Sequence, residues 1–96
     1  VISNTTIDRS NLATDSLTVE DIGAGGLSGA PVKAKSNDAL LHLKKHLPKH
    51  IPIIGVGGIM HKKDGAEKLD LGADLIQIYT GFVYKGIGLV KALAKL

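Results

Sequence analysis

The segment IPIIGVGG, residues 51–58, limits the possible folds more than any other part of the chain. Its apolar run is far too short to cross a membrane, which takes about 20 residues, and it ends in a pair of glycines. Strands that are apolar on both faces occur where both faces are covered, as in parallel sheets. Pro52 fits only at the beginning of such a strand, because its nitrogen cannot donate a hydrogen bond. The segment therefore predicts a buried parallel strand followed by a loop of bare backbone.

An apolar strand, a glycine-bearing loop and an amphipathic helix follow one another three times along the chain. Alternating strands and helices predict an α/β protein with a parallel sheet, and the right-handed crossover rule places the helices on one side. Three strands cannot close a barrel, so we expect further strands upstream. The expected strands lie near residues 1–3, 53–56 and 75–79, and the expected helices near residues 37–47, 62–71 and 88–96.

Local signals define the first of these helices. Ser36 or Asn37 is suited to cap it, and the side chains of both residue types accept hydrogen bonds from helix N–H groups. Leu40, Leu43 and Leu47 recur at the spacing of a single buried stripe. We therefore expect this helix to pack against the sheet along one leucine-bearing face.

Composition excludes several classes of protein. The 96 residues include no cysteine, which rules out a disulfide framework and thiolate metal sites in this segment. The net charge of +3 comes mainly from scattered lysines and only 3% of residues are aromatic, so we expect no nucleic-acid partner. The chain opens on Val1 and carries no targeting pattern. We expect a soluble piece of a longer protein that is poorly stable when expressed alone.

Glycines at the ends of two neighbouring strands indicate an anion site. Gly57 and Gly58 follow one strand, and Gly81 follows the next in the segment YTG. Bare backbone lets N–H groups approach an anion, and the helix that follows such a loop adds its positive end. In β/α barrels the last two loops and a short extra helix form a recurrent phosphate site, and FVYKG, residues 82–86, suits that helix. The alternative is that GVGG only makes a tight turn.

Four blocks of the sequence together resemble one family. They are NTTIDR at 4–9, GGLSGAPV at 25–32, IPIIGVGGI at 51–59 and GADLIQIYTGFVYKG at 72–86. In order and spacing they are similar to the C-terminal part of dihydroorotate dehydrogenase, and most similar to the quinone-dependent class 2 branch. The resemblance runs through almost the whole chain.

This resemblance implies that residues 1–96 are the last three βα units of a (β/α)8 TIM barrel, a single FMN-binding domain whose N-terminal strands lie outside the segment. It implies oxidation of dihydroorotate to orotate by hydride transfer to FMN, which a quinone reoxidises, in pyrimidine biosynthesis. It also implies a peripheral protein of the inner membrane, held there by a segment absent from this chain.

The resemblance also assigns roles to particular residues. Asn4 and Thr5 fall at substrate positions, where a carboxamide and a hydroxyl can bond a pyrimidine and its carboxylate. The alternative for Asn4 is a local turn that ends a strand. The catalytic serine and a flavin-contacting lysine lie upstream in the family, so we expect no catalytic residue here. The expected FMN contacts are Ser3, Gly29, Gly58, Tyr79 and Thr80, with Gly57 and Gly81 in the same phosphate pocket.

One departure from the family concerns the helix near residues 62–71. The family often has an acidic or hydroxyl cap after GGI, whereas this chain has Met60 and His61, followed by Gly65 within the helix. We therefore expect this helix to be loose at its start. Gly72 is placed to end it in the left-handed conformation.

A histidine pattern offers a competing site. His42, His46 and His50 recur every four residues, a spacing that can bind zinc. Nearby lysines would repel a cation, and no carboxylate stands beside the histidines to orient an imidazole. We therefore expect a solvated helix face and no metal site.

The sequence leaves two other functions possible, and it assigns no role to one long loop. A phosphate-binding barrel lyase or isomerase would share the glycine loops without a flavin, and a non-catalytic domain could bind a phosphate ligand without any chemistry. The long segment from Asn11 to Ala24 matches no block of the family, and its acidic residues are expected to be solvated. These acids are Asp15, Glu20 and Asp21.

Overall fold

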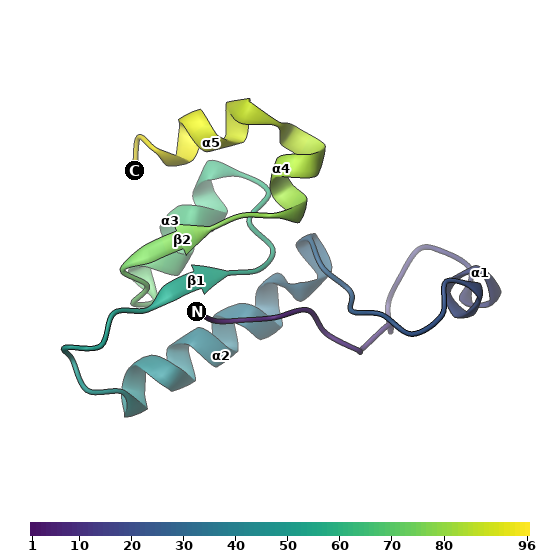
Figure 1. Cartoon of the computed structure of the whole chain (residues 1–96), viewed down its shortest axis with the longest axis horizontal. Coiled ribbons are helices and arrows are strands. Elements are labelled where there is room, and N and C mark those ends of the chain that lie inside the picture. The colour runs from purple at the N-terminus through teal and green to yellow at the C-terminus, as the bar shows by residue number, and fades with distance from the viewer.

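Two parallel strands, β1 (Ile54–Val56) and β2 (Leu75–Gln77), form the centre of the computed structural model, which describes residues 1–96. The N-terminal segment lies on the other edge of β1, where Ile2 forms a parallel bridge with Gly55. The N–H of Ile2 donates to the Ile54 carbonyl at 2.8 Å. The predicted parallel arrangement of three neighbouring segments is confirmed, although residues 1–3 contribute a bridge rather than a full strand (Figure 1).

Helices follow each of these segments, as the sequence predicts. The last strand is followed by a short helix in the position expected for FVYKG, beginning two residues earlier than expected. The helices in chain order are α1 (Ser16–Asp21), the 3-10 turn η1 (Ala30–Val32), α2 (Lys33–His46), α3 (Lys62–Asp70), α4 (Thr80–Lys85) and α5 (Ile87–Leu93).

The helices α2, α3 and α5 pack on one face of the sheet. Gly55 and Ile76 are partners in the strand register and therefore point to the same side. Gly55 lies against Leu40 of α2, and Ile76 lies beside Gly65 of α3, which also faces the end of α5. The opposite face is open, and Leu75 on that face is 61% exposed. One-sided packing is thus confirmed, and the second face has no cover within this chain.

The start of α2 differs from the prediction. The helix begins at Lys33, directly after η1, so Ser36 and Asn37 lie within it and cap nothing. Both are buried, and their side chains are hydrogen bonded to groups outside the helix. The expected leucine stripe is present, with Leu40 fully buried in the core cluster that Ile53 and Ala73 complete.

The start of α3 is also different from the prediction. Asp64, in the first turn, accepts hydrogen bonds from the N–H groups of Met60 at 3.0 Å and His61 at 2.9 Å. The start that was expected to be loose is therefore held by a capping box, in which the carboxylate comes from inside the helix. Gly65 allows close packing, since a Cβ there would lie 3.0 Å from Ile76 Cδ1. Gly72 has a positive φ of 116° after the helix ends, as predicted.

The segment expected to be a loop, residues 11–24, contains the short helix α1. Figure 1 shows it lying apart from the sheet, and none of its residues is buried. The Arg9 side chain stabilises this segment by donating hydrogen bonds to the carbonyls of Val19, Gly23 and Gly25. The acidic residues of the segment are exposed to solvent, as expected.

No helix in the chain combines the length and the apolar content that crossing a bilayer requires.

Candidate functional site

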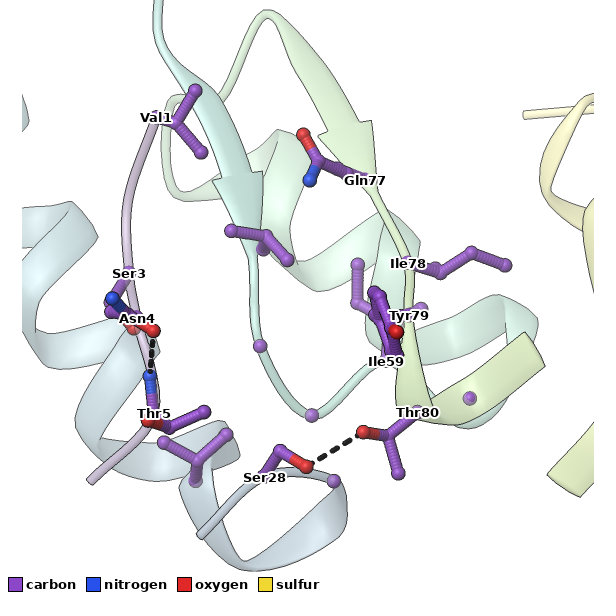
Figure 2. Close-up of a pocket in the computed structure, with 16 residues that line it drawn as sticks. Val1, Ser3, Asn4, Thr5, Ser28, Ile59, Gln77, Ile78, Tyr79 and Thr80 are labelled. Atoms are coloured by element: carbon purple, nitrogen blue, oxygen red, sulfur yellow. Dashed lines mark hydrogen bonds between the residues drawn. The ribbon is translucent and has the colours of Figure 1, made fainter. Parts of the chain in front are cut away.

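A pocket of about 570 Å³ opens at the carboxyl ends of β1 and β2 (Figure 2). Loops after all three parallel segments line it, together with the loop that precedes η1. The carboxyl ends of parallel strands meet at one edge of a sheet, which is where ligands bind in such folds. Every residue that the sequence singles out for binding lies in this lining: Ser3, Asn4, Thr5, Gly29, Gly57, Gly58, Tyr79, Thr80 and Gly81.

Ser28 also lines the pocket and was missed by the sequence reasoning. Its hydroxyl lies 2.7 Å from that of Thr80, so the two loops meet through a hydrogen bond (Figure 2). Its position beside Gly29 in the block GGLSG was a signal that could have identified it. Gln77 and Ile78 complete the wall formed by the end of β2.

Several backbone N–H groups of the pocket have no acceptor within the protein. Those of Gly57 and Gly58 make no hydrogen bond, and neither do those of Thr80 and Gly81 at the start of α4. The start of α3 does not contribute, because no residue of that helix lines the pocket. The helix that offers its positive end to the pocket is therefore α4, and the pocket suits an anionic group.

Gly57 and Gly58 are glycines because a Cβ at either position would collide with α2, which packs behind the loop. Both glycines have positive φ, at 124° and 75°. A Cβ on Gly57 would lie 2.8 Å from Ser36 Oγ, and one on Gly58 would lie 2.5 Å from the Cα of Lys33. A side chain at either position would therefore collide with the helix behind the loop.

Glycines also allow the other pocket loops to approach one another. A Cβ on Gly29 would lie 3.1 Å from Thr80 Cγ2, and Gly29 has a positive φ of 82°. Gly81 lies directly against the carbonyl of Ile59, so a Cβ there would overlap that oxygen. The absence of a side chain at Gly29 and Gly81 therefore lets the loops around the pocket pack closely against one another.

Asn4 and Thr5 lie on the N-terminal side of the pocket. The Asn4 side-chain oxygen accepts a hydrogen bond from the Thr5 N–H at 2.8 Å (Figure 2). This local bond is the one expected from a turn, yet the Asn4 amide nitrogen keeps its protons for another acceptor. The geometry is therefore compatible with both interpretations of Asn4.

An ion pair lies beside the glycine loop. Lys33 Nζ is 3.0 Å from Asp64 Oδ1, and the Asp64 residue is 4% exposed. Burial alone would raise the pKa of Asp64, but hydrogen bonds from Met60, Lys33 and His61 outweigh burial and lower it. The hydrogen bond to Asp64 also raises the pKa of Lys33. Both side chains are therefore charged at neutral pH.

The histidines do not form a metal site with other ligands. The rings of His42 and His46 have centroids 4.6 Å apart and are exposed on α2. No group of three or more histidine, cysteine, aspartate or glutamate side chains is placed to hold a metal ion.

Comparison with known proteins gives the family. Residues 1–95 match the family model described as dihydroorotate dehydrogenase. The chain belongs to the dihydroorotate dehydrogenase family.

The curated relatives carry the name dihydroorotate dehydrogenase (quinone). One from Neisseria meningitidis is 50% identical over 95 residues, which are 99% of this chain and 28% of the relative. One from Chromobacterium violaceum is 47% identical over 95 residues, covering 27% of its length. The chain therefore spans little more than a quarter of the relatives that it matches.

Solved dihydroorotate dehydrogenase structures have the same fold in this region. The crystal structure of ligand-free DHODH from Eimeria tenella superposes with a TM-score of 0.85 at 29% identity, over 99% of this chain and 26% of that one. The same enzyme in complex with ferulenol gives a TM-score of 0.76 at 32% identity. The α/β arrangement is thus shared with dihydroorotate dehydrogenases.

Proposed function

We propose that the protein containing this chain oxidises dihydroorotate to orotate, with FMN as its flavin and a quinone as the electron acceptor, in pyrimidine biosynthesis. The observation that carries the proposal is that relatives named for this quinone-dependent activity are 50% identical over 95 residues. The pocket supports it, because all nine residues expected from the family line one cavity.

The donors in the pocket fit the phosphate of FMN. The N–H groups of Gly57, Gly58 and Gly81 are without acceptors, and Ser28 and Thr80 line the same pocket with their hydroxyls 2.7 Å apart. A phosphate offers several strong acceptor oxygens, and N–H groups at loop and helix starts are suited to them. FMN held by these residues would supply the redox chemistry, which is hydride acceptance from dihydroorotate and electron transfer to a quinone.

We assign substrate orientation to Asn4 and Thr5. The free amide protons of Asn4 can donate to a pyrimidine carbonyl or carboxylate, and the Thr5 hydroxyl can donate or accept beside it. Gly26 lies directly beneath the Thr5 side chain, so the position of this threonine is restricted by backbone. The proposal places the catalytic base and the flavin-contacting lysine outside this chain.

The proposal also concerns the architecture of the whole protein. We assign this chain to the last three βα units of a (β/α)8 barrel, whose other strands would cover the open sheet face around Leu75. Membrane association, at the inner membrane, would come from a segment outside residues 1–96.

The test is to purify the full-length protein and record its absorption spectrum. We expect a bound flavin that bleaches when dihydroorotate is added without oxygen and that recovers its colour when a quinone is added. A flavin that does not bleach would argue for a non-catalytic binding protein. A colourless protein that binds phosphate esters would favour the lyase or isomerase alternative.

A further inference from the structure

A buried chain of hydrogen bonds lies behind the pocket and joins α3, α2 and the end of β1. Lys68 on α3 is 0% exposed. Its amino group donates to Ser36 Oγ at 3.0 Å and to Asn37 Oδ1 at 2.7 Å. Ser36 in turn donates to the Val56 carbonyl at 2.6 Å. No carboxylate forms an ion pair with Lys68.

The direction of these bonds follows from proton counting. A serine hydroxyl has one proton, and the Val56 carbonyl can only accept, so that proton lies between Ser36 and Val56. Ser36 Oγ must then accept from Lys68. The chain therefore runs from the lysine, through the serine, to the carbonyl of Val56.

The Val56 carbonyl belongs to the same peptide group as the N–H of Gly57. Gly57 lines the pocket, and its N–H has no acceptor within the protein. Hydrogen bonds in series polarise one another, most strongly where water is excluded. A donor bound to the carbonyl side of a peptide therefore makes the N–H on its other side a stronger donor.

Two features indicate that this arrangement is more than packing. A buried lysine without a carboxylate partner is costly, and burial lowers the pKa of Lys68. An apolar side chain would fill the same space without that cost. Gly57 is also required here, because a Cβ would lie 2.9 Å from the Cβ of Ser36 and force the serine away from Val56.

We propose that Lys68 and Ser36 are positioning residues for the pocket. Together with the Ser3 N–H, which donates to the same Val56 carbonyl at 2.9 Å, they fix the peptide between Val56 and Gly57, and they strengthen the Gly57 N–H as a donor to an anionic group. This inference rests on the proposed function in one respect, that the anionic group is the phosphate of the flavin. Neither residue touches the ligand, and both act through the peptide group.

The test compares FMN with riboflavin, which has the same ring system without the phosphate. Each flavin is titrated into the flavin-free full-length protein, and binding is followed by quenching of flavin fluorescence. In Ser36→Ala we expect the FMN dissociation constant to rise about five- to tenfold, as for one weakened bond to a charged group. The riboflavin constant should change less than about twofold, because riboflavin has no phosphate for the Gly57 N–H to bind.

Asn37→Ala is the matched control. It also removes one of the two acceptors of Lys68, but it leaves the bond from Ser36 to Val56 in place. We expect the ratio of FMN to riboflavin affinity to stay at the wild-type value in this variant. The proposal would be overturned if Ser36→Ala lost affinity for both flavins equally. It would also be overturned if Asn37→Ala changed the ratio of FMN to riboflavin affinity as much as Ser36→Ala does.

Lys68→Met provides a second variant, because it keeps an unbranched side chain and removes the amino group. We expect the FMN to riboflavin ratio to fall here as well, and an unchanged ratio would overturn the role of the lysine. If Ser36→Ala does not fold, the FMN to riboflavin affinity ratio of Lys68→Met tests the proposal by itself. Absence of binding of either flavin to the wild-type protein would contradict the proposed function instead.

Discussion

Lys33 and Asp64 join the beginnings of α2 and α3 across the glycine loop of the pocket. The Lys33 Nζ lies 3.0 Å from Asp64 Oδ1, while the backbone of the same lysine packs directly against Gly58. The loop is therefore enclosed by two helices whose starts are linked by charge. Its shape depends on this link as well as on the conformational freedom of glycine.

Gly58→Val should abolish FMN retention in the full-length protein. The new side chain would collide with Lys33 and would also occupy a position with a φ of 75°, which a branched residue strongly disfavours. The loop and its N–H groups would be displaced from the pocket. The measurement is the flavin to protein ratio after purification, together with the melting temperature.

The control for this variant is Gly88→Ala, at a helix position where a Cβ would meet nothing within 4 Å. It should keep its flavin and be as stable as the wild type, or up to about 1 kcal/mol more stable. A Gly58→Val protein with a full complement of FMN would refute the assignment.

Asn4→Ala should separate substrate binding from flavin binding. The methyl group removes the amide donors but leaves the loops around Gly57 and Thr80 unchanged, so FMN should stay bound. A lost hydrogen bond in a desolvated site costs about 1 to 3 kcal/mol, so kcat/KM for dihydroorotate should fall at least about tenfold.

Anaerobic bleaching of the flavin by dihydroorotate measures this first half of the reaction, and reoxidation of chemically reduced protein by quinone measures the second. Only bleaching should slow. Normal bleaching with slow reoxidation would reverse the assignment, and loss of flavin would mean that Asn4 holds the cofactor or the strand.

Asp64→Asn should destabilise the protein in a pH-dependent way. The pKa of Asp64 is lowered in the folded state, so its stabilising effect is complete above the unfolded-state value of about 3.9 and is lost as the pH falls through the lower folded value. At pH 7 the variant should lose about 1 to 3 kcal/mol of unfolding free energy.

Urea unfolding at a series of pH values from 7 downward checks this prediction. The difference in unfolding free energy between the wild type and Asp64→Asn should be constant down to about pH 4 and should become smaller below it. Asp38→Asn, on the exposed side of α2, should show no such gap. A gap that widens as the pH falls would contradict the assigned direction of the pKa shift.

Residues 1–96 expressed alone should lack a cooperative unfolding transition. One face of the sheet is open and carries exposed apolar groups such as Leu75, and exposed apolar surface of this kind favours association over a stable monomer. Calorimetry and size exclusion chromatography of the isolated segment test this. A sharp melting transition of a monomer would show that the segment is an independent folding unit.

The strands and most of the helices could be predicted because their signals are local. A continuous apolar run marked β1, the segment ADLIQIY marked β2, and leucine spacing marked α2 and its buried Leu40. The α2 boundary could not be read in the same way. Ser36 and Asn37 look like caps, but their side chains serve Lys68, which is about thirty residues away and invisible to a local pattern.

The candidate site was predictable as a set of residues but not in its physical basis. The family motifs pointed to Gly57 and Gly58, and these residues do line the pocket. Sequence spacing could not tell that their Cβ positions are excluded by Ser36 and Lys33, because those contacts exist only once α2 has docked. The cap from Asp64 is not visible in the residues before the helix, because the carboxylate belongs to its first turn.

The docking of α2 on Gly57 and Gly58 restricts how this pocket can be altered or transplanted. A designer who grafts only the loop into another barrel would place it against a foreign helix, where a residue larger than serine at the position of Ser36 would push the loop aside. The loop and the first turn of α2 form one transferable unit, and substitutions in either should be selected jointly rather than one position at a time.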